Sequence, residues 1–278
     1  MIKPNSNVVT TNWLHEYLEH ENLIVLYTQM DNPMTGAKDD VPKGYIPGSR
    51  FFDFEHVFCD STSNLPHTMP NLKVFTQEAA KLGINQRSTI VVYDNKGVYC
   101  APRVWWMIKS IGVENVFVLN GGLPKWLEEN RPLQVSLSKP KGGEDFSAHY
   151  LSYSFMSAND ILQKQNTLKL LDARSAGRFN GTESEPRAGL RSGHAPNALN
   201  MPFVSCLNGS ELKSSSDLST LFLSLGLQKE QHLVFSCGSG VTACVLALAA
   251  SQAGYEKLSV YDGSWSEWGA REDLPVEL

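Results

Sequence analysis

The chain carries the same succession of sequence features twice, and this internal repeat constrains its fold more than any other property. Gly193-His194-Ala195-Pro196 matches Gly44-Tyr45-Ile46-Pro47 at an offset of 149 residues. Trp126 and Trp268 lie 142 residues apart, and the segments before them match at the same offset. A shared order of matches across about 120 residues indicates two copies of one domain.

Within each copy, short apolar segments alternate with segments of helical periodicity. Strands are predicted at Leu23–Tyr27, Thr89–Tyr93, Val116–Leu119, Leu168–Asp172 and Leu233–Phe235. Helices are predicted at residues 11–18, 76–83, 101–110 and 241–253. Such alternation predicts an α/β protein of two tandem domains, each a central, mostly parallel sheet flanked by helices.

The stretch between the two copies has the composition of a linker. It is polar and contains both glycine and proline, which favour a connecting segment. A chain of 278 residues is also long enough for two domains of ordinary size. We therefore expect a first domain at residues 1–136, a linker at 137–151 and a second domain at 152–278.

Composition excludes several classes of function. A net charge of −5 argues against nucleic acid as a main partner, because phosphate binding needs a basic face. No apolar run approaches the ~20 residues of a membrane span, and the N-terminus lacks the apolar core of a secretion signal. Five cysteines without a Cys-x-x-Cys pair predict neither a disulfide framework nor a zinc site. These features favour a cytoplasmic location.

Cys237 is the strongest candidate nucleophile. It follows an apolar predicted strand, and an apolar predicted helix begins a few residues later, after Gly238 and Gly240. The carboxyl end of a parallel strand beneath a helix N-terminus favours an anion, and therefore a thiolate. In the first copy Asp94 occupies the place of Cys237. Because a purely structural cysteine would have left the copies alike, we predict a catalytic second copy and an inactive first copy.

Arginines gather in the second copy after the strand that ends at Asp172. Arg174, Arg178 and Arg187 lie there, whereas the matching stretch 31–43 of the first copy has lysines and no arginine. Arginine suits a two-point grip on a carboxylate. The pattern predicts an anionic substrate, although an ordinary solvated loop would also carry arginines. We expect Asp172 to be structural, as a partner of Arg174 or of a helix N-terminus.

The motifs Cys237–Ala243 and Gly193–Ala198, together with an inactive first copy, resemble the tandem-domain rhodanese-like sulfurtransferases, and within them the 3-mercaptopyruvate branch. The resemblance implies a Cys237 persulfide that receives the sulfur of 3-mercaptopyruvate and releases pyruvate. The sulfur then passes to a thiol, such as thioredoxin or a small thiol, or to cyanide. Neither a metal nor an organic cofactor is implied. Asn197 departs from the glycine of relatives, but asparagine tolerates the same left-handed backbone.

The resemblance also assigns residues to roles. It implies that Arg178 and Arg187 bind the substrate, and that Ser239 takes part in proton transfer with Asp53 and His67 of the first domain. It further implies that a cradle of N–H groups surrounds the outer sulfur of the persulfide. The cradle residues are Gly238, Ser239, Gly240, Val241 and Thr242.

Three alternatives remain open at this stage. Thiosulfate sulfurtransferases favour cationic residues directly after the cysteine, whereas Gly238 and Ser239 are neutral here, which suits a carboxylate donor. A cysteine-dependent phosphatase needs a loop ending in arginine, and no basic residue lies between Cys237 and Ala243. A non-catalytic binding module would fit the Asp94 copy but not the Cys237 copy.

Overall fold

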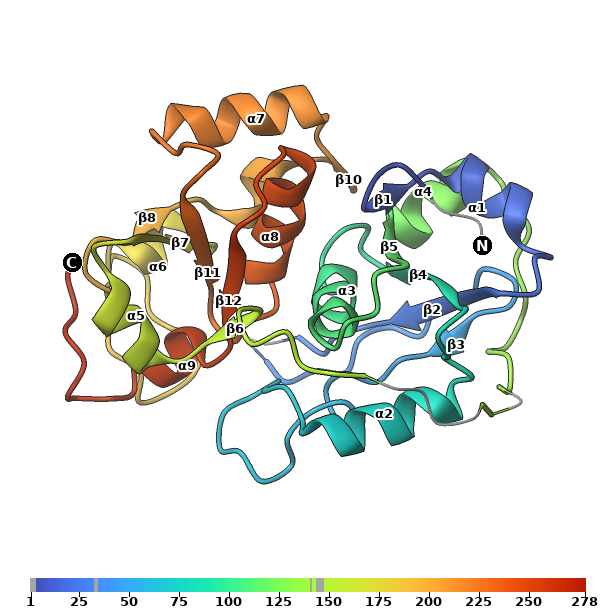
Figure 1. Ribbon diagram of the computed structural model, residues 1–278, viewed down its shortest axis with the longest axis horizontal. Coiled ribbons are helices and arrows are strands. Elements are labelled where there is room, and N and C mark those ends of the chain that lie inside the picture. Colours follow the sequence, from blue (N-terminus) through green and yellow to red (C-terminus); the bar gives the residue numbers. More distant parts are fainter. Residues whose placement is uncertain (1–3, 33–34, 141, 144–147) are drawn as a thin grey trace.

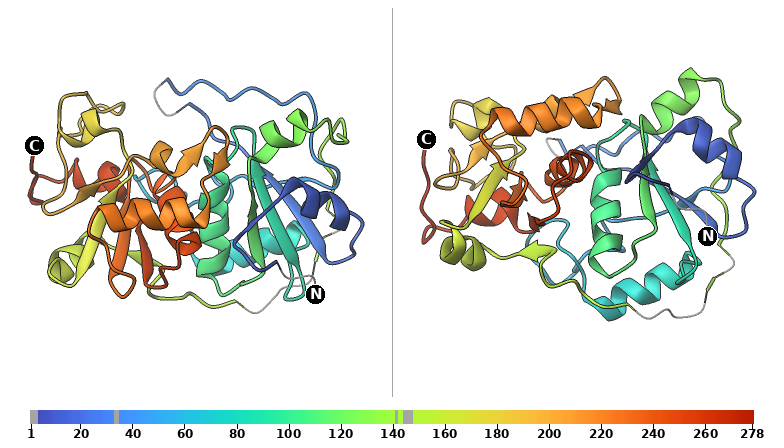
Figure 2. Two further views of the ribbon diagram at one scale, coloured as in Figure 1. Left: turned by 90° about the horizontal axis from the view of Figure 1, so that it is seen from above. Right: turned by 45° about the horizontal axis from the view of Figure 1, so that its top comes forward.

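The computed structural model describes residues 4–32, 35–140, 142–143 and 148–278, which form two α/β domains side by side (Figures 1 and 2). The first domain contains β1 (Val8–Val9), α1 (Thr11–Tyr17), β2 (Leu23–Thr28), β3 (Arg50–Phe51), α2 (Leu72–Lys81), β4 (Thr89–Asp94), α3 (Ala101–Ser110), β5 (Val116–Leu119) and α4 (Gly122–Glu128). The second contains β6 (Phe155–Met156), α5 (Ala158–Lys164), β7 (Leu168–Asp172), α6 (Ala176–Phe179), β8 (Leu199–Asn200), the 3-10 helix η1 (Phe203–Cys206), β9 (Leu207–Asn208), β10 (Glu211–Leu212), α7 (Ser215–Ser224), β11 (His232–Ser236), α8 (Ala243–Gln252), β12 (Leu258–Tyr261) and α9 (Ser264–Trp268).

Each domain is built on a five-stranded sheet, and the two sheets have the same topology. Their strand orders are β1-β5-β4-β2-β3 and β6-β12-β11-β7-β8. All the neighbouring pairs in both sheets are parallel. The strand orders correspond one to one, so the structure confirms the predicted repeat and the α/β fold class. The central strands read as apolar runs because helices cover both faces of each sheet.

The predicted strands agree with the observed ones within one residue at either end, but two helices differ. The helix predicted at 76–83 begins at Leu72, because the Asn71 side chain accepts the N–H of Val74 and caps an earlier turn. Helix α8 begins at Ala243 rather than at residue 241. Val241 and Thr242 therefore belong to the loop that follows Cys237, and the helix starts just behind it.

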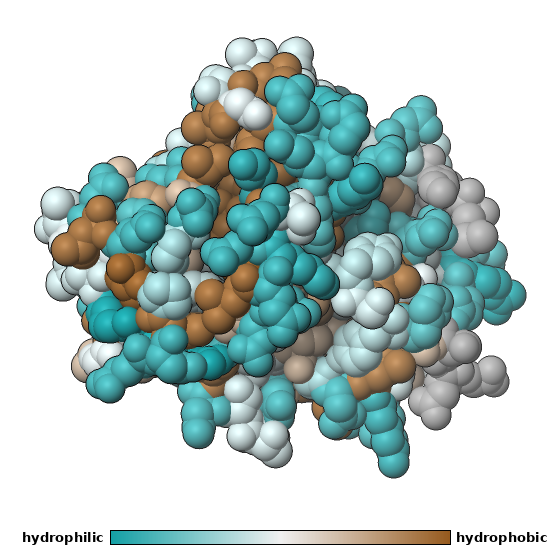
Figure 3. All heavy atoms as spheres, turned by 60° about the vertical axis from the view of Figure 1, so that its left-hand side comes forward, coloured by the Kyte–Doolittle hydropathy of each residue, from teal (hydrophilic) through white to brown (hydrophobic). Residues whose placement is uncertain are grey.

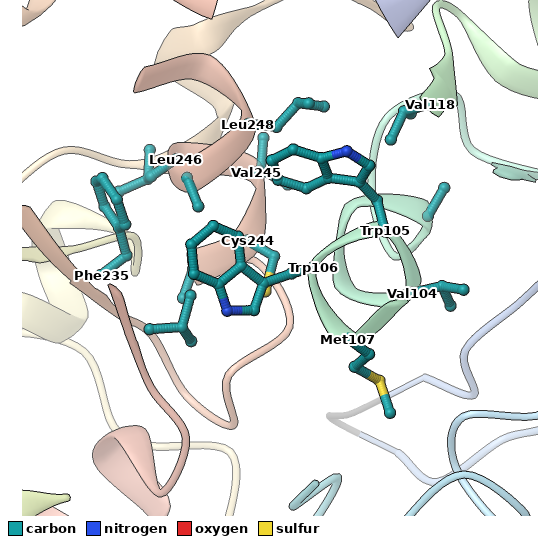
Figure 4. Close-up of a cluster of buried hydrophobic side chains, with 14 of the residues drawn as sticks. Val104, Trp105, Trp106, Met107, Val118, Phe235, Cys244, Val245, Leu246 and Leu248 are labelled. Carbon is teal, nitrogen blue, oxygen red and sulfur yellow. The ribbon is translucent and has the colours of Figure 1, made fainter. Parts of the chain in front are cut away.

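Helices lie on both faces of each sheet and place α3 and α8 against each other. In the first domain α1 and α4 pack on the outer face, while α2 and α3 pack on the face toward the second domain. In the second domain α5 and α9 cover the outer face, and α7 and α8 the inner one. Trp105 and Trp106 of α3 lie against Cys244 and Val245 of α8 (Figure 4). One continuous apolar core thus joins the domains.

The two domains also reach into each other's loops in a pseudo-symmetric way. The segment before α2 in the first domain reaches the Cys237 loop, which we define as residues 237–242. The turn of the β9–β10 hairpin of the second domain lies against the corresponding loop after Asp94, because a Cβ added at Gly97 would meet the backbone of Ser210. The hairpin is also held just after β5 and at α4, where Leu212 N–H donates to Asn120 Oδ1 at 2.8 Å and Glu211 pairs with Lys125 at 3.5 Å. The loop after Asp94 in the first copy is therefore covered by the hairpin.

The described part of the predicted linker runs along the first domain. Ser138 N–H donates to Ser49 O at 2.7 Å, and Leu151 N–H donates to Ser110 O at 2.8 Å. Residues 141 and 144–147 of that linker lie outside the described residues.

On the second-domain side, hydrophobic residues at the surface are interspersed with hydrophilic ones (Figure 3). No helix in the described ranges is long and apolar enough to cross a membrane.

Candidate active site

Cys237 lies at the bottom of a pocket of about 220 Å³ at the carboxyl end of β11. Only 2% of Cys237 is exposed. Its N–H donates to Ser264 Oγ at 3.2 Å, and its carbonyl accepts the N–H of Trp265 at 2.9 Å. The start of α9 thus holds the cysteine backbone from one side, and α8 begins behind the loop. The structure agrees with the sequence-based position of the thiol.

The first copy shows what this type of loop surrounds. Asp94 takes the place of Cys237, and its carboxylate accepts four backbone N–H groups at 2.8–2.9 Å, from Lys96, Tyr99, Cys100 and Ala101. The residues at the same offset in the second copy are Ser239, Thr242, Ala243 and Cys244. A loop that wraps backbone N–H groups around a side-chain anion is suited to an anionic sulfur on Cys237.

Both predicted substrate arginines border the Cys237 loop. A Cβ added at Gly238 would lie 3.2 Å from Arg178 Nη2 and 3.8 Å from Arg187 Nη1. Glycine at this position therefore lets the two guanidinium groups approach the backbone next to Cys237. The structure brings Cys237, Ser239, Arg178 and Arg187 together in one pocket.

The two arginines differ in how their charge is balanced. Arg178 forms a two-point ion pair with Glu185, at 3.1 Å from Nε and 2.6 Å from Nη2, and Glu185 also contacts Arg174 at 2.7 Å. Arg187 contacts Ser266 Oγ at 3.5 Å, and within the described chain no carboxylate lies at ion-pair distance from it. Burial lowers the pKa of Arg187, while the facing Cys237 opposes that shift. Arg187 is thus a half-buried cation that faces Cys237 and has no carboxylate partner among the described residues.

The remaining polar residues around the pocket support its walls. Arg174 pairs with Asp172 at 2.6 Å, as predicted, and lies 4.2 Å from the ring centre of Trp265. His194 stacks on Phe179 at 3.7 Å. Asn197 adopts the left-handed conformation expected of it, with a φ of 60°, and the matching Gly48 has a φ of 82°. Asp172 and His194 therefore hold loops in place.

A hydrogen-bonded chain crosses from the first domain to the Cys237 loop. His67 Nδ1 lies 3.0 Å from Ser239 Oγ, and His67 Nε2 lies 3.2 Å from Glu55 Oε1. The side chains of His67 and Glu55 are 9% and 16% exposed. Ser239, His67 and Glu55 form a serine–histidine–carboxylate arrangement that can move a proton to or from the pocket.

Glu55 is the residue that the sequence reasoning missed. Asp53, named instead as the acidic partner, accepts the backbone N–H groups of Glu55 and His56 and contacts His56 Nδ1 at 3.0 Å. It stabilises the turn, while Glu55 contacts His67. The sequence offered two carboxylates in Asp53-Phe54-Glu55, and only the turn geometry decides which of them faces the histidine.

The other cysteines lack the surroundings of a nucleophile. Burial raises the pKa of both Cys206 and Cys244 to about 12. Burial also raises the pKa of Cys59, and neighbouring carboxylates add to that shift. In the part of the chain that is described, no group of three or more His, Cys, Asp or Glu side chains is placed to hold a metal. A larger hollow of about 380 Å³ near Trp105 and Trp106 has neither cysteine nor histidine among its lining residues.

The fold and this pocket define a two-domain α/β protein with a cysteine, Cys237, in a glycine-containing loop at the carboxyl end of a parallel strand. Residues 10–129 and 157–271 each match the model of the rhodanese-like domain. The 3-mercaptopyruvate sulfurtransferase of Escherichia coli (strain K12) is 39% identical over 276 residues, covering 97% of each chain. A thiosulfate sulfurtransferase of Cricetulus griseus is 37% identical over 273 residues, covering 94% of this chain and 91% of the relative. The crystal structure of SseA from Escherichia coli, a 3-mercaptopyruvate sulfotransferase, superposes with a TM-score of 0.83 at 34% identity, covering 95% of this chain and all of that one. The chain belongs to the family of proteins with rhodanese-like domains.

Gly240 offers a direct test of how tightly the Cys237 loop is packed. It has a φ of +76°, and an added Cβ would lie 3.1 Å from both Arg103 Nη1 and Asp262 O. We expect Gly240→Ala to lower the free energy of unfolding by about 2–4 kcal/mol, because backbone strain adds to crowding. Gly226→Ala is the matched control, since Gly226 has a φ of +74° and open space around it. Chemical denaturation measures both variants, and equal losses would show that the loop is not tightly packed.

Proposed function

We propose that this protein is a 3-mercaptopyruvate sulfurtransferase that carries sulfur as a persulfide on Cys237. The observation that carries the proposal is the half-buried Arg187, which has no carboxylate partner in the described chain and faces Cys237 across the neutral Gly238-Ser239 backbone. A cation set back from Cys237 by the width of the loop suits a keto acid in which two carbon atoms separate the sulfur from the carboxylate. The names and similarity of the relatives from Escherichia coli support the same donor.

In the first half-reaction, the Cys237 thiolate attacks the sulfur of the donor. A sulfur–sulfur bond forms, the carbon–sulfur bond breaks, and its electron pair stays on the carbon fragment as the enolate of pyruvate. Arg187 and Arg178 hold the carboxylate and the keto oxygen, where negative charge grows in the transition state. Glu185 fixes the orientation of Arg178 through its two-point ion pair.

The proton of the donor thiol must reach the enolate to complete pyruvate. Ser239 Oγ borders the pocket and contacts His67, which contacts Glu55. In our proposal Ser239 and His67 accept this proton and return it to the enolate carbon, while Glu55 holds the imidazole in place. We assign Asp53 to the support of the turn rather than to the proton path. The loop N–H groups of residues 238–242 surround the outer sulfur.

In the second half-reaction, an acceptor removes the outer sulfur. A thiolate, from a reduced thioredoxin or a small thiol, or else cyanide, attacks that sulfur, and Cys237 leaves as the thiolate. The chemistry is complete without a metal or an organic cofactor. All five cysteines are free, which fits the reducing cytoplasm that we propose as the location. The proposed domain limits, 1–136 and 152–278, enclose the two matched family regions.

Thiosulfate is the second candidate donor, and the thiosulfate sulfurtransferase of Cricetulus griseus favours it. Thiosulfate is a compact dianion without a thiol proton, so it makes no use of the Ser239–His67–Glu55 chain. The presence of that chain, with its contacts of 3.0 and 3.2 Å, favours a donor whose proton must be moved.

Donor competition tests the proposal. We expect kcat/KM to be at least about tenfold higher for 3-mercaptopyruvate than for thiosulfate, because only the former uses the proton path and the two-point arginine grip. Mass spectrometry after incubation with 3-mercaptopyruvate and no acceptor should show one added sulfur on the peptide that contains Cys237. A clear preference for thiosulfate, or no added sulfur, would contradict the assignment.

A further inference from the structure

Arg103 is a buried cation of the first domain that donates hydrogen bonds to three segments bordering the active site. It lies on α3 and is 0% exposed. Its Nη2 donates to the carbonyl of His67 at 2.6 Å and to Asp262 Oδ1 at 2.7 Å, and its Nη1 lies 3.4 Å from the carbonyl of Gly240. One guanidinium group therefore contacts the histidine segment, the Cys237 loop and the end of β12.

Asp262 completes this arrangement from the other domain. Its Oδ2 accepts the N–H of Met69 at 2.8 Å, while its Oδ1 accepts from Arg103. The backbone on either side of residue 68 is thus held at two points, at the His67 carbonyl by Arg103 and at the Met69 N–H by Asp262. Both contacts end on the same ion pair, which crosses the domain interface.

The held segment has an unusual backbone. His67 has a φ of +62°, a value that residues other than glycine rarely adopt. Such a conformation persists only where the surrounding structure imposes it. With this backbone, the imidazole of His67 reaches Ser239 Oγ on one side and Glu55 on the other. The orientation of the imidazole therefore depends on contacts that fix the main chain of His67.

We propose that the Arg103–Asp262 ion pair is a positioning device that holds the strained backbone of His67 and so sets the proton path of the active site. Arg103 and Asp262 are positioning residues, because they act through the backbone around His67. The inference rests on the proposed function, which supplies the proton that His67 and Ser239 move. It also gives the inactive domain a part in the reaction, because it supplies His67 and one half of the ion pair.

In a purely structural explanation, the Arg103–Asp262 ion pair would serve only to stabilise the interface between the domains. Buried ion pairs are weak evidence for stability, because the loss of hydration offsets their attraction. The domains are already joined by the apolar packing of α3 on α8 (Figure 4). Arg103 also leaves its buried Nε without a hydrogen-bond partner in the described structure, a feature that does not favour stability. The hydrogen bonds to the backbone around His67 explain why the ion pair lies at this place, whereas domain association does not.

The choice of donor separates the two explanations. Arg103→Lys keeps the charge but cannot make the same forked set of contacts. We expect its kcat with 3-mercaptopyruvate to fall about 10–100-fold, because proton transfer by a positioned side chain contributes that much or more. With thiosulfate, which brings no thiol proton, we expect kcat to change by less than about threefold. Asp262→Asn, which can keep one of the two acceptor contacts, should show the same selectivity with a smaller effect.

A double-mutant cycle then tests whether Arg103 acts through His67. In a His67→Ala background, Arg103→Lys should cost less than about threefold in kcat with 3-mercaptopyruvate, because the group it positions is gone. Equal losses with both donors, or a full additional loss in the His67→Ala background, would overturn the proposal in favour of a structural role. Thermal unfolding of each variant checks that it folds, and Asp262→Asn replaces Arg103→Lys if the latter does not.

A readout without turnover keeps this inference separate from the proposed function. A crystal structure of Asp262→Asn or Arg103→Lys should show the His67 imidazole displaced from Ser239 Oγ. An imidazole that stays within hydrogen-bond distance of Ser239 would overturn the positioning role, whichever donor the wild-type protein uses. If the wild-type protein gains no sulfur from 3-mercaptopyruvate, the proposed function fails, and the crystal structure still decides the role of the pair.

Discussion

Cys237→Ser is expected to lose sulfur transfer from 3-mercaptopyruvate by about four orders of magnitude or more, because the step that depends on the nucleophile disappears. A serine hydroxyl at the same place can neither ionise near neutral pH nor hold a second sulfur. The pocket around it should stay intact, since the Cys237 backbone is held by Ser264 and Trp265 rather than by the thiol. Pyruvate release measures the loss of turnover, and the mass of the peptide that contains residue 237 measures the loss of the bound sulfur.

Cys59→Ser is the matched control for this experiment. Cys59 Sγ donates to the carbonyl of Glu55 at 3.0 Å, and a serine hydroxyl can make the same contact. Cys59 lies near the proton path, yet it is absent from the residues that line the Cys237 pocket. We expect the control to keep at least about half of the wild-type rate. An active Cys237→Ser protein, or an equal loss in both variants, would refute the persulfide mechanism.

The sequence predicted the fold class, the repeat and five of the sheet strands because the relevant signals are local. Each predicted strand is an apolar run, whereas β12 and the two-residue edge strands β1, β3, β6 and β8 were not predicted. The place of Cys237 at the end of its strand, opposite Asp94 in the first copy, follows from the same register. The α-helix that begins at Ala243 was predicted to begin two residues earlier. Val241 and Thr242 are uncharged, like the residues of the helix, so the sequence shows no boundary between them.

The contacts that complete the site could not be predicted in this way. Glu55 faces His67 only because of the turn that Asp53 stabilises, and no periodicity distinguishes the two carboxylates. Arg103 joins Asp262 across 159 residues of sequence and across the domain interface. Such contacts depend on how the two copies are oriented relative to each other. The repeat establishes that there are two copies, but it does not give their relative orientation.

Arg187→Met is expected to lower kcat/KM for 3-mercaptopyruvate about 10²–10⁴-fold, through both KM and kcat, because Arg187 also faces the charge that grows on the enolate. Two charge-assisted hydrogen bonds to the carboxylate contribute about 1.5–3 kcal/mol each, and about 1.4 kcal/mol corresponds to a factor of ten. The folded protein, by contrast, should be as stable as the wild type or more so. Burial lowers the pKa of Arg187, which means that the surrounding protein disfavours its charged form. No carboxylate of the described chain pairs with Arg187, so removing its charge breaks no ion pair.

Arg178→Met provides the contrast, because Arg178 is paired where Arg187 is not. Its removal leaves Glu185, whose side chain is only 2% exposed, with Arg174 as its remaining cation. We expect an activity loss together with a decrease of about 2 kcal/mol or more in the free energy of unfolding. Steady-state kinetics and chemical denaturation on both variants separate the two roles. Equal destabilisation by both substitutions would mean that Arg187 has a structural partner after all, whereas a stable but catalytically weak Arg187→Met protein would identify the cation reserved for the substrate.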